Sequence, residues 1–167
     1  MKLVMVIAFE GFRDEEYDIP RKIFDANGVD VDVASYQVGE ATGKFGMKVK
    51  VDLNYLDIDM DSYDALVLIG GPGTTYYLDD EPMQQIASDF LEEYKLVGAI
   101  CMAPVILANA GLLEDKKATV FEGNVEDIKQ MGAIYTGNNV EQVDNLLTAC
   151  GPQAAEEFGQ KIVQYLK

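Results

Sequence analysis

The fold is decided by one short segment, residues 98–104, which reads GAICMAP. It completes an apolar run that begins at Leu96, and such a run predicts a buried strand that ends at Ile100. The residues that follow are compatible with a helix and place Pro104 in its first turn. The segment therefore predicts a strand, a sharp turn and a helix, with the thiol of Cys101 at the apex of the turn.

This elbow predicts an ionised thiol at Cys101. An elbow holds its apical side chain out of the sheet, often in strained backbone geometry. The helix beyond it directs free N–H groups and a partial positive charge at the sulfur, and both favour the thiolate, which is the reactive form. The alternative is a small buried thiol without chemistry, a common fate of a cysteine in an apolar run. Taken by itself, the segment does not decide between the two.

Composition and charge limit the possible partners. The chain has 167 residues, of which 49% are hydrophobic, and we expect a single domain spanning residues 1–167. The formal net charge of -16 argues against nucleic acid and against anionic membrane surfaces as partners. No apolar run approaches the roughly 20 residues that a membrane-spanning helix needs. Two cysteines without a signal sequence predict a reducing, cytoplasmic location and no disulfide framework.

The chain contains no histidine. A catalytic pair of cysteine or serine with histidine is therefore impossible, even across an interface between copies. Histidine-ligated metal sites are excluded as well, and we expect neither a metal nor a cofactor. Any proton transfer must fall to aspartate, glutamate, tyrosine or lysine, or to the substrate.

Predicted strands and helices alternate along the chain. Strands are expected over residues 3–8, 29–35, 65–69, 96–100, 117–121 and 134–136, and hairpins over residues 42–51 and 140–148. Helices are expected over residues 15–26, 81–91, 104–109, 125–131 and 154–166. The pattern predicts a flavodoxin-like α/β sandwich of three layers, with a mostly parallel sheet and helices on both faces. Sites in such sheets gather at the carboxyl ends of strands, here after Ala8, after Ile69 and at the elbow.

A glycine-rich loop follows one of these strands. Residues 70–73 read GGPG, and such a loop can leave N–H groups unpaired and directed inward. Together with the N–H of Met102, it could stabilise a developing oxyanion. The alternative is a plain strand-to-helix turn without a binding role, since glycine-rich turns after strands are common. The loop is neither a Walker loop nor a dinucleotide-binding fingerprint.

Acidic residues open the first predicted helix, and most of them are expected to be surface groups that stabilise the helix dipole. One of them lies at the mouth of the first strand and can point at the elbow. A carboxyl group buried against a thiol would keep its proton and donate a hydrogen bond to the thiolate. The pattern does not choose between Glu15 and Glu16.

Together these motifs resemble the ThiJ/PfpI superfamily, which includes the parkinsonism-associated protein deglycase and archaeal intracellular peptidases. The resemblance spans essentially the whole chain. It rests on Glu16 placed four residues before Pro20, the strand that ends in Gly70-Gly71, the elbow at residues 99–104, and Gly151-Pro152 before the last helix.

The resemblance implies a role for each of these positions. Cys101 would be the nucleophile and Glu16 its protonated carboxyl partner. The anion pocket would lie at Gly70, Gly71 and Met102, with the N–H groups of the last two as donors. Relatives form dimers or hexamers, so the resemblance also implies a homo-oligomer.

The chain departs from the family pattern at three places. Peptidase-type members carry a histidine directly after the cysteine, where this chain has Met102. Deglycase and glyoxalase members commonly carry a histidine on a nearby loop, where the matching position is Phe121. Arg13 and Arg21 are the only arginines, so the pocket arginines of some relatives are also missing. A peptidase triad is excluded, and a glyoxalase mechanism would require Glu16 to move the proton unaided.

These observations favour an enzyme of glyoxalase or deglycase type, in which Cys101 adds to a small reactive carbonyl compound and forms a hemithioacetal. The alternative is a non-enzymatic redox-sensing or chaperone-like stress protein, in which an oxidant modifies the same sulfur. A binding domain that retains only the fold is a third possibility. Cys150 is expected to be a packed or partly exposed thiol, and a resolving role is disfavoured because nothing in the sequence shows that its sulfur lies near that of Cys101.

Overall fold

A seven-stranded sheet lies at the centre of the structure, a computed structural model that describes residues 1–167. Its strands are β1 (Lys2–Val6), β3 (Asp30–Ser35), β6 (Leu53–Asn54), β7 (Ala65–Leu68), β8 (Leu96–Ile100), β11 (Val140–Val143) and β12 (Leu146–Ala149). Their order is β11-β12-β8-β7-β1-β3-β6, and every neighbouring pair is parallel except β11 with β12. The mostly parallel sheet predicted from the sequence is confirmed.

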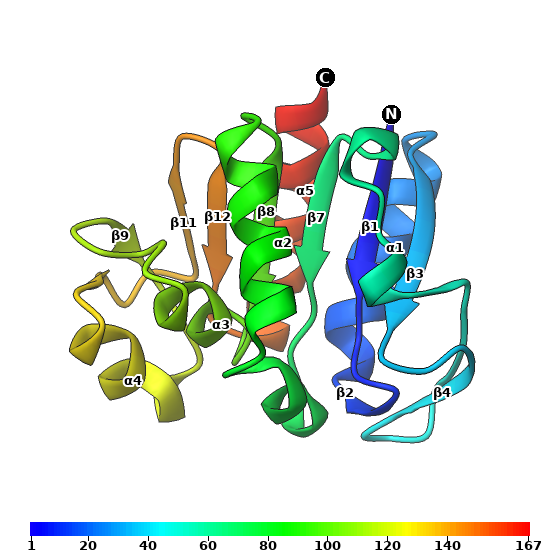
Figure 1. Ribbon diagram of the computed structural model, residues 1–167, viewed down its shortest axis with the longest axis horizontal. Helices are drawn as coiled ribbons and strands as arrows, with labels where there is room; N and C mark the ends of the chain where they lie inside the picture. The colour runs from blue at the N-terminus through cyan, green and yellow to red at the C-terminus, as the bar shows by residue number, and fades with distance from the viewer.

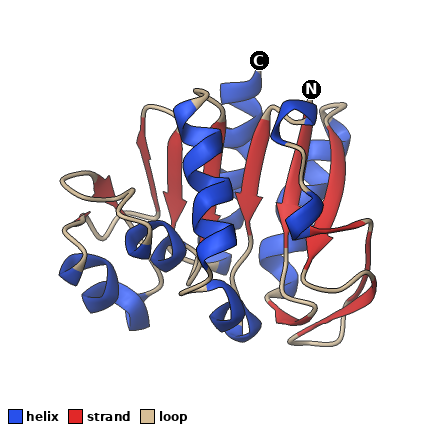
Figure 2. Cartoon of the chain, in the orientation of Figure 1, coloured by secondary structure: helices blue, strands red, loops and turns tan.

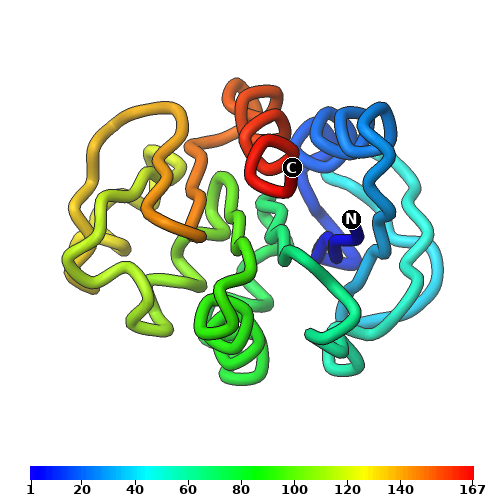
Figure 3. The backbone as a smooth tube through the Cα atoms, turned by 90° about the horizontal axis from the view of Figure 1, so that it is seen from above, coloured from blue at the N-terminus to red at the C-terminus, as the bar shows by residue number.

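Helices cover both faces of this sheet (Figure 1, Figure 2). They are α1 (Asp14–Ala26), α2 (Glu81–Glu92), α3 (Pro104–Asn109), α4 (Val125–Gln130) and α5 (Ala155–Leu166). Seen from above, α1 and α5 lie together on one face, and α2 lies on the other (Figure 3). The three-layer α/β sandwich is therefore confirmed. None of the helices has the length and apolar composition to cross a bilayer.

The alternation of side chains in β1 shows how the layers are held together. Leu3 and Met5 join one core cluster of 24 buried residues, which also contains Phe158 of α5. Val4 and Val6 point to the opposite face and join a second cluster of 24 residues, which contains side chains of α2. Successive residues of a strand face opposite sides, so a strand that is apolar throughout must be covered on both faces.

Two smaller sheets lie outside the central one. They contain β2 (Glu10–Phe12), β4 (Gly39–Gly43) and β5 (Lys48–Val51), and β9 (Lys117–Ala118) with β10 (Ile134–Tyr135). The hairpin predicted over residues 42–51 is confirmed by the antiparallel pairing of β4 with β5. The strand predicted over residues 117–121 is wrong beyond Ala118. Its last residue, Phe121, donates its N–H to the carbonyl of Cys101 at 2.8 Å instead of to a partner strand.

The register brings the expected site loops to one edge of the sheet. Leu68 lies opposite both Val6 and Ala99, and Ala149 lies opposite Ile100. The carboxyl ends of β1, β7, β8 and β12 are therefore neighbours, along the lower edge of the sheet in Figure 1. The start of α1, the glycine loop and the elbow all follow these ends, so the topology alone brings them together.

Candidate active site

Cys101 lies directly after β8, at the turn that the sequence predicts. Its φ is +63°, a value that non-glycine residues rarely adopt. Its N–H donates to the carbonyl of Ala149 at 2.9 Å, and this bond ties the elbow to the neighbouring strand. The strained backbone therefore persists because the surrounding sheet holds it, as is common at functional sites.

Glu16 is the acid that faces the elbow. Its side chain is fully buried, and its Oε2 accepts the N–H of Gly70 at 3.0 Å. Its Oε1 is buried and has no oxygen or nitrogen partner. Its neighbour Glu15 instead points outward, partly exposed, and pairs with Arg13 at 2.7 Å. The structure thus resolves the choice between Glu15 and Glu16 that the sequence leaves open.

The lack of a side chain at Gly70 allows Glu16 and Cys101 to lie close to each other. A Cβ at this position would lie 2.6 Å from Cys101 Cβ and 2.7 Å from Glu16 Oε2, so no side chain fits between them. We expected Gly70 to contribute to the anion pocket, and its N–H cannot do so because it already donates to Glu16. Its role is to position the carboxyl group.

The other two expected donors, the N–H groups of Gly71 and Met102, donate to no backbone carbonyl. Gly71 adopts a φ of +117°, which only glycine adopts readily, and this conformation turns the chain between β7 and the following helical turn. The Met102 N–H interacts with the sulfur of Cys101 and lowers its pKa. These two groups are the candidate anion pocket.

Burial and proximity raise the pKa of both ionisable groups. Burial raises the pKa of Glu16 to about 7. Burial, followed by the negative charge of Glu16, raises the pKa of Cys101 to about 12. The expectation of a lowered thiol pKa is therefore wrong. The Met102 N–H and the Arg13 guanidinium lower the pKa of Cys101, but their effect is smaller than that of burial and of Glu16.

The physical reason for this correction lies in the helix and in the acid. The helix after the elbow, α3, has only six residues and begins three residues beyond the sulfur, so its dipole is weak there. The carboxyl group, by contrast, is in direct contact with the thiol. The buried pair loses its first proton near pH 7 and keeps the second to high pH. Above pH 7 it therefore holds one proton and one negative charge, which suits a proton-transfer site.

A cavity of about 430 Å³ opens beside the elbow. Its lining includes Arg13, Phe121 and Cys150, but neither Cys101 nor Glu16. Phe121 stands where a histidine of relatives was expected, and it borders the elbow through its N–H bond to Cys101. Its ring supplies no proton-transfer group. Arg13 is the cation whose charge acts on both Cys101 and Glu16, a role that the sequence did not reveal.

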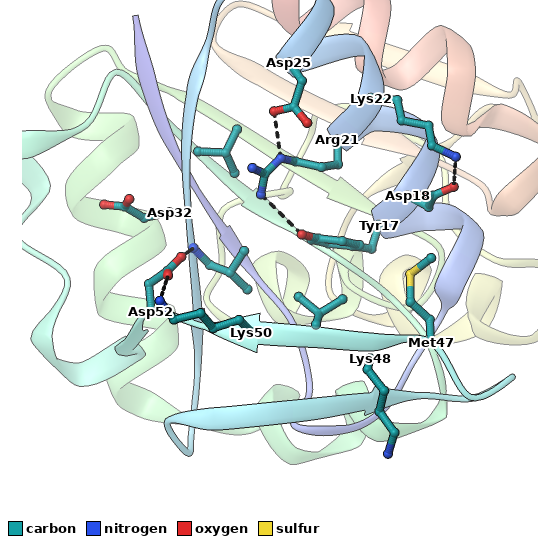
Figure 4. A pocket seen from close by; sticks show the side chains of 13 residues that line it. Tyr17, Asp18, Arg21, Lys22, Asp25, Asp32, Met47, Lys48, Lys50 and Asp52 are labelled. Carbon is teal, nitrogen blue, oxygen red and sulfur yellow. Dashed lines mark hydrogen bonds and ion pairs between the residues drawn. The ribbon is translucent and has the colours of Figure 1, made fainter.

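A second cavity, of about 610 Å³, lies away from the elbow, between α1 and β3 and β5 (Figure 4). Several of its charged side chains pair with one another. Arg21 donates to Asp25 and to the hydroxyl of Tyr17, and Lys22 pairs with Asp18. None of the predicted site residues lines this cavity, and no buried polar atom there lacks a partner. The one buried side-chain oxygen or nitrogen that lacks a hydrogen-bond partner is Oε1 of Glu16.

The fold and this site define an α/β protein with an elbow cysteine and a buried glutamate partner. The chain belongs to the DJ-1/PfpI family, whose model matches residues 1–165. An uncharacterized protein of Methanocaldococcus jannaschii is 39% identical over 169 residues, which cover 99% of this chain and 82% of that protein. The deglycase PfpI of Pyrococcus furiosus is 33% identical over 167 residues, with 100% of each chain covered. A solved ThiJ/PfpI domain protein of Brachyspira murdochii has a TM-score of 0.97 and 33% identity, covering 99% of this chain and 95% of that one.

Proposed function

We propose that the protein is a cofactor-independent enzyme of deglycase or glyoxalase type that acts on small reactive carbonyl compounds. One observation carries the proposal: a fully buried carboxyl group with a pKa of about 7 contacts a thiol at a strained elbow. An acid whose pKa lies near neutrality can both give and take a proton, so Glu16 suffices without a histidine. Family relatives named as deglycases support this reaction class.

The proposed reaction with methylglyoxal begins at the sulfur. Cys101 attacks the aldehyde carbon as the thiolate, and the proton held by the pair passes to the carbonyl oxygen, giving a hemithioacetal. Glu16 then removes the hydrogen on that carbon as a proton and delivers it to the adjacent carbon, while the hydroxyl proton moves from the first oxygen to the second, giving a thioester of lactate. Water cleaves the thioester, releases lactate and a proton, and restores the thiol. The balance is methylglyoxal plus water to lactate plus a proton.

Two features of the site fit these steps. The unpartnered Oε1 of Glu16 is the atom left to carry the moving proton, because Oε2 is held by Gly70. The N–H groups of Gly71 and Met102, which donate to no backbone carbonyl, are the donors for the oxygen that becomes negative.

Lactate formation tests this proposal. We expect the protein to convert methylglyoxal to lactate at a rate about 100-fold or more above buffer, a typical contribution of positioned acid–base groups. Methylglyoxal should also slow the alkylation of Cys101 by iodoacetamide, because the hemithioacetal occupies the sulfur. Lactate at the buffer rate, together with unchanged alkylation, would refute the proposal.

A further inference from the structure

The two cysteines lie at the ends of neighbouring parallel strands. Ile100 of β8 lies opposite Ala149 of β12, and Cys101 and Cys150 are the next residues on each strand. The N–H of Cys101 donates to the carbonyl of Ala149 at 2.9 Å, and that carbonyl carbon is bonded to the nitrogen of Cys150. Ordinary bond lengths and the planarity of the peptide bond between Ala149 and Cys150 then keep the two Cα atoms within about 7 Å. Disulfides join Cα atoms about 4.4–6.8 Å apart, so the backbone spacing admits a bond.

The surroundings of the two sulfurs are shared. Both side chains are partly exposed, neither is in a disulfide, and both pack against the same core cluster. The negative charge of Glu16 acts on both thiols. Cys150 lines the cavity of about 430 Å³ together with Phe121, whose N–H donates to the carbonyl of Cys101, so a small oxidant that enters there comes close to the elbow. The Sγ of Cys150 accepts a hydrogen bond from Gln153 Nε2 at 3.3 Å and donates one to Asn139 Oδ1 at 3.6 Å, and burial raises the pKa of this thiol.

We propose that Cys150 is the resolving thiol of Cys101. A hydroperoxide oxidises Cys101 to the sulfenic acid: the sulfur takes the terminal oxygen, the O–O bond breaks, and water or an alcohol leaves. Cys150 loses its proton and attacks that sulfur, an S–S bond forms, and the oxygen leaves as water. A low-molecular-weight thiol restores both cysteines by exchange. These steps require no carbonyl substrate, so they can succeed or fail independently of the proposed lactate-forming activity.

The test compares the full chain with Cys150→Ser and Cys101→Ser. Each is treated at pH 8 with one equivalent of hydrogen peroxide, then blocked with iodoacetamide and examined by intact mass and non-reducing peptide mapping. We expect the wild type to lose the mass of two hydrogen atoms, remain monomeric under denaturing conditions and yield a Cys101–Cys150 linked peptide. Cys150→Ser should instead carry added oxygen on Cys101, and its sulfinic acid should accumulate about tenfold faster than in the wild type.

Cys101→Ser provides the matched control, since Cys150 should then stay reduced and be alkylated. If Cys150→Ser folds poorly, Cys150→Ala gives the same comparison, because both remove only the second sulfur. Oxygen uptake at Cys101 at equal rates in the wild type and Cys150→Ser, with Cys150 still open to alkylation, would overturn the proposal. A disulfide that forms only between chains would overturn it too.

Discussion

Replacement of Cys101 by alanine is expected to reduce lactate formation from methylglyoxal to the rate in buffer. The variant removes the only sulfur that contacts the buried carboxyl group of Glu16. The chain contains no histidine that could activate another nucleophile. Loss of a covalent nucleophile typically lowers turnover by a factor of about 1,000 or more, so the residual rate should not be measurable above background.

Two further variants make this result interpretable. Cys101→Ser keeps the size and the polar contact but lacks the nucleophilicity of sulfur, and it should be as inactive as the alanine variant. Glu93→Gln removes an exposed carboxylate at the end of α2, far from the elbow, and should retain full activity. Circular dichroism should show the same fold in all variants. More than a tenth of wild-type activity in Cys101→Ala would show that the nucleophile lies elsewhere.

The substitution Gly71→Ala is expected to cause the largest loss of stability among single changes at the site. A Cβ there would lie 2.6 Å from the carbonyl oxygen of Gly11 and 2.7 Å from the carbonyl carbon of Phe12, and backbone atoms cannot move aside easily. The φ of +117° adds a second, independent cost. Together, strain and overpacking should lower the free energy of unfolding by about 2–5 kcal/mol. For a chain of this size the midpoint of thermal unfolding should fall by about 10 °C.

Gly46→Ala is the matched control for this effect. Gly46 also has a positive φ, +94°, but nothing lies within 4 Å of an added Cβ. Gly46→Ala therefore measures the effect of the positive φ alone, which should lower the free energy of unfolding by about 1–2 kcal/mol. Equal losses of stability in the two variants would show that close packing around Gly71 contributes nothing.

Much of the fold follows from local patterns in the sequence. Continuous apolar runs as short as residues 65–69, bounded by turn residues, predict strands that are covered on both faces, and the parallel sheet follows from the helices between them. The elbow is also a local feature, since the strand, the cysteine and Pro104 are adjacent in the chain. The loops after strands meet at one edge by topology, and this places the acidic start of the first helix near Cys101 before any coordinates are known.

Features that depend on packing between distant segments could not be predicted from the sequence. Glu15 and Glu16 are both plausible from the helix pattern, and only the three-dimensional arrangement shows that Glu15 pairs outward with Arg13. The direction of the thiol pKa depends on the depth of burial and on contact with Glu16, neither of which a motif records. The proximity of Cys150 depends on the register between β8 and β12, whose residues lie some fifty positions apart.

The central claim is that Glu16 and Cys101 share their protons, and the pH dependence of Cys101 alkylation tests it most directly. In the wild type the rate should rise as the pH passes about 7, because the pair loses its first proton there and the proton that remains can lie on Glu16, which leaves the sulfur as the thiolate. In Glu16→Gln the titration of the carboxyl group is absent, and the rise should move above pH 8.5, the ordinary range of a thiol, because the sulfur stays partly buried. Superimposable profiles for the wild type and Glu16→Gln would contradict the account.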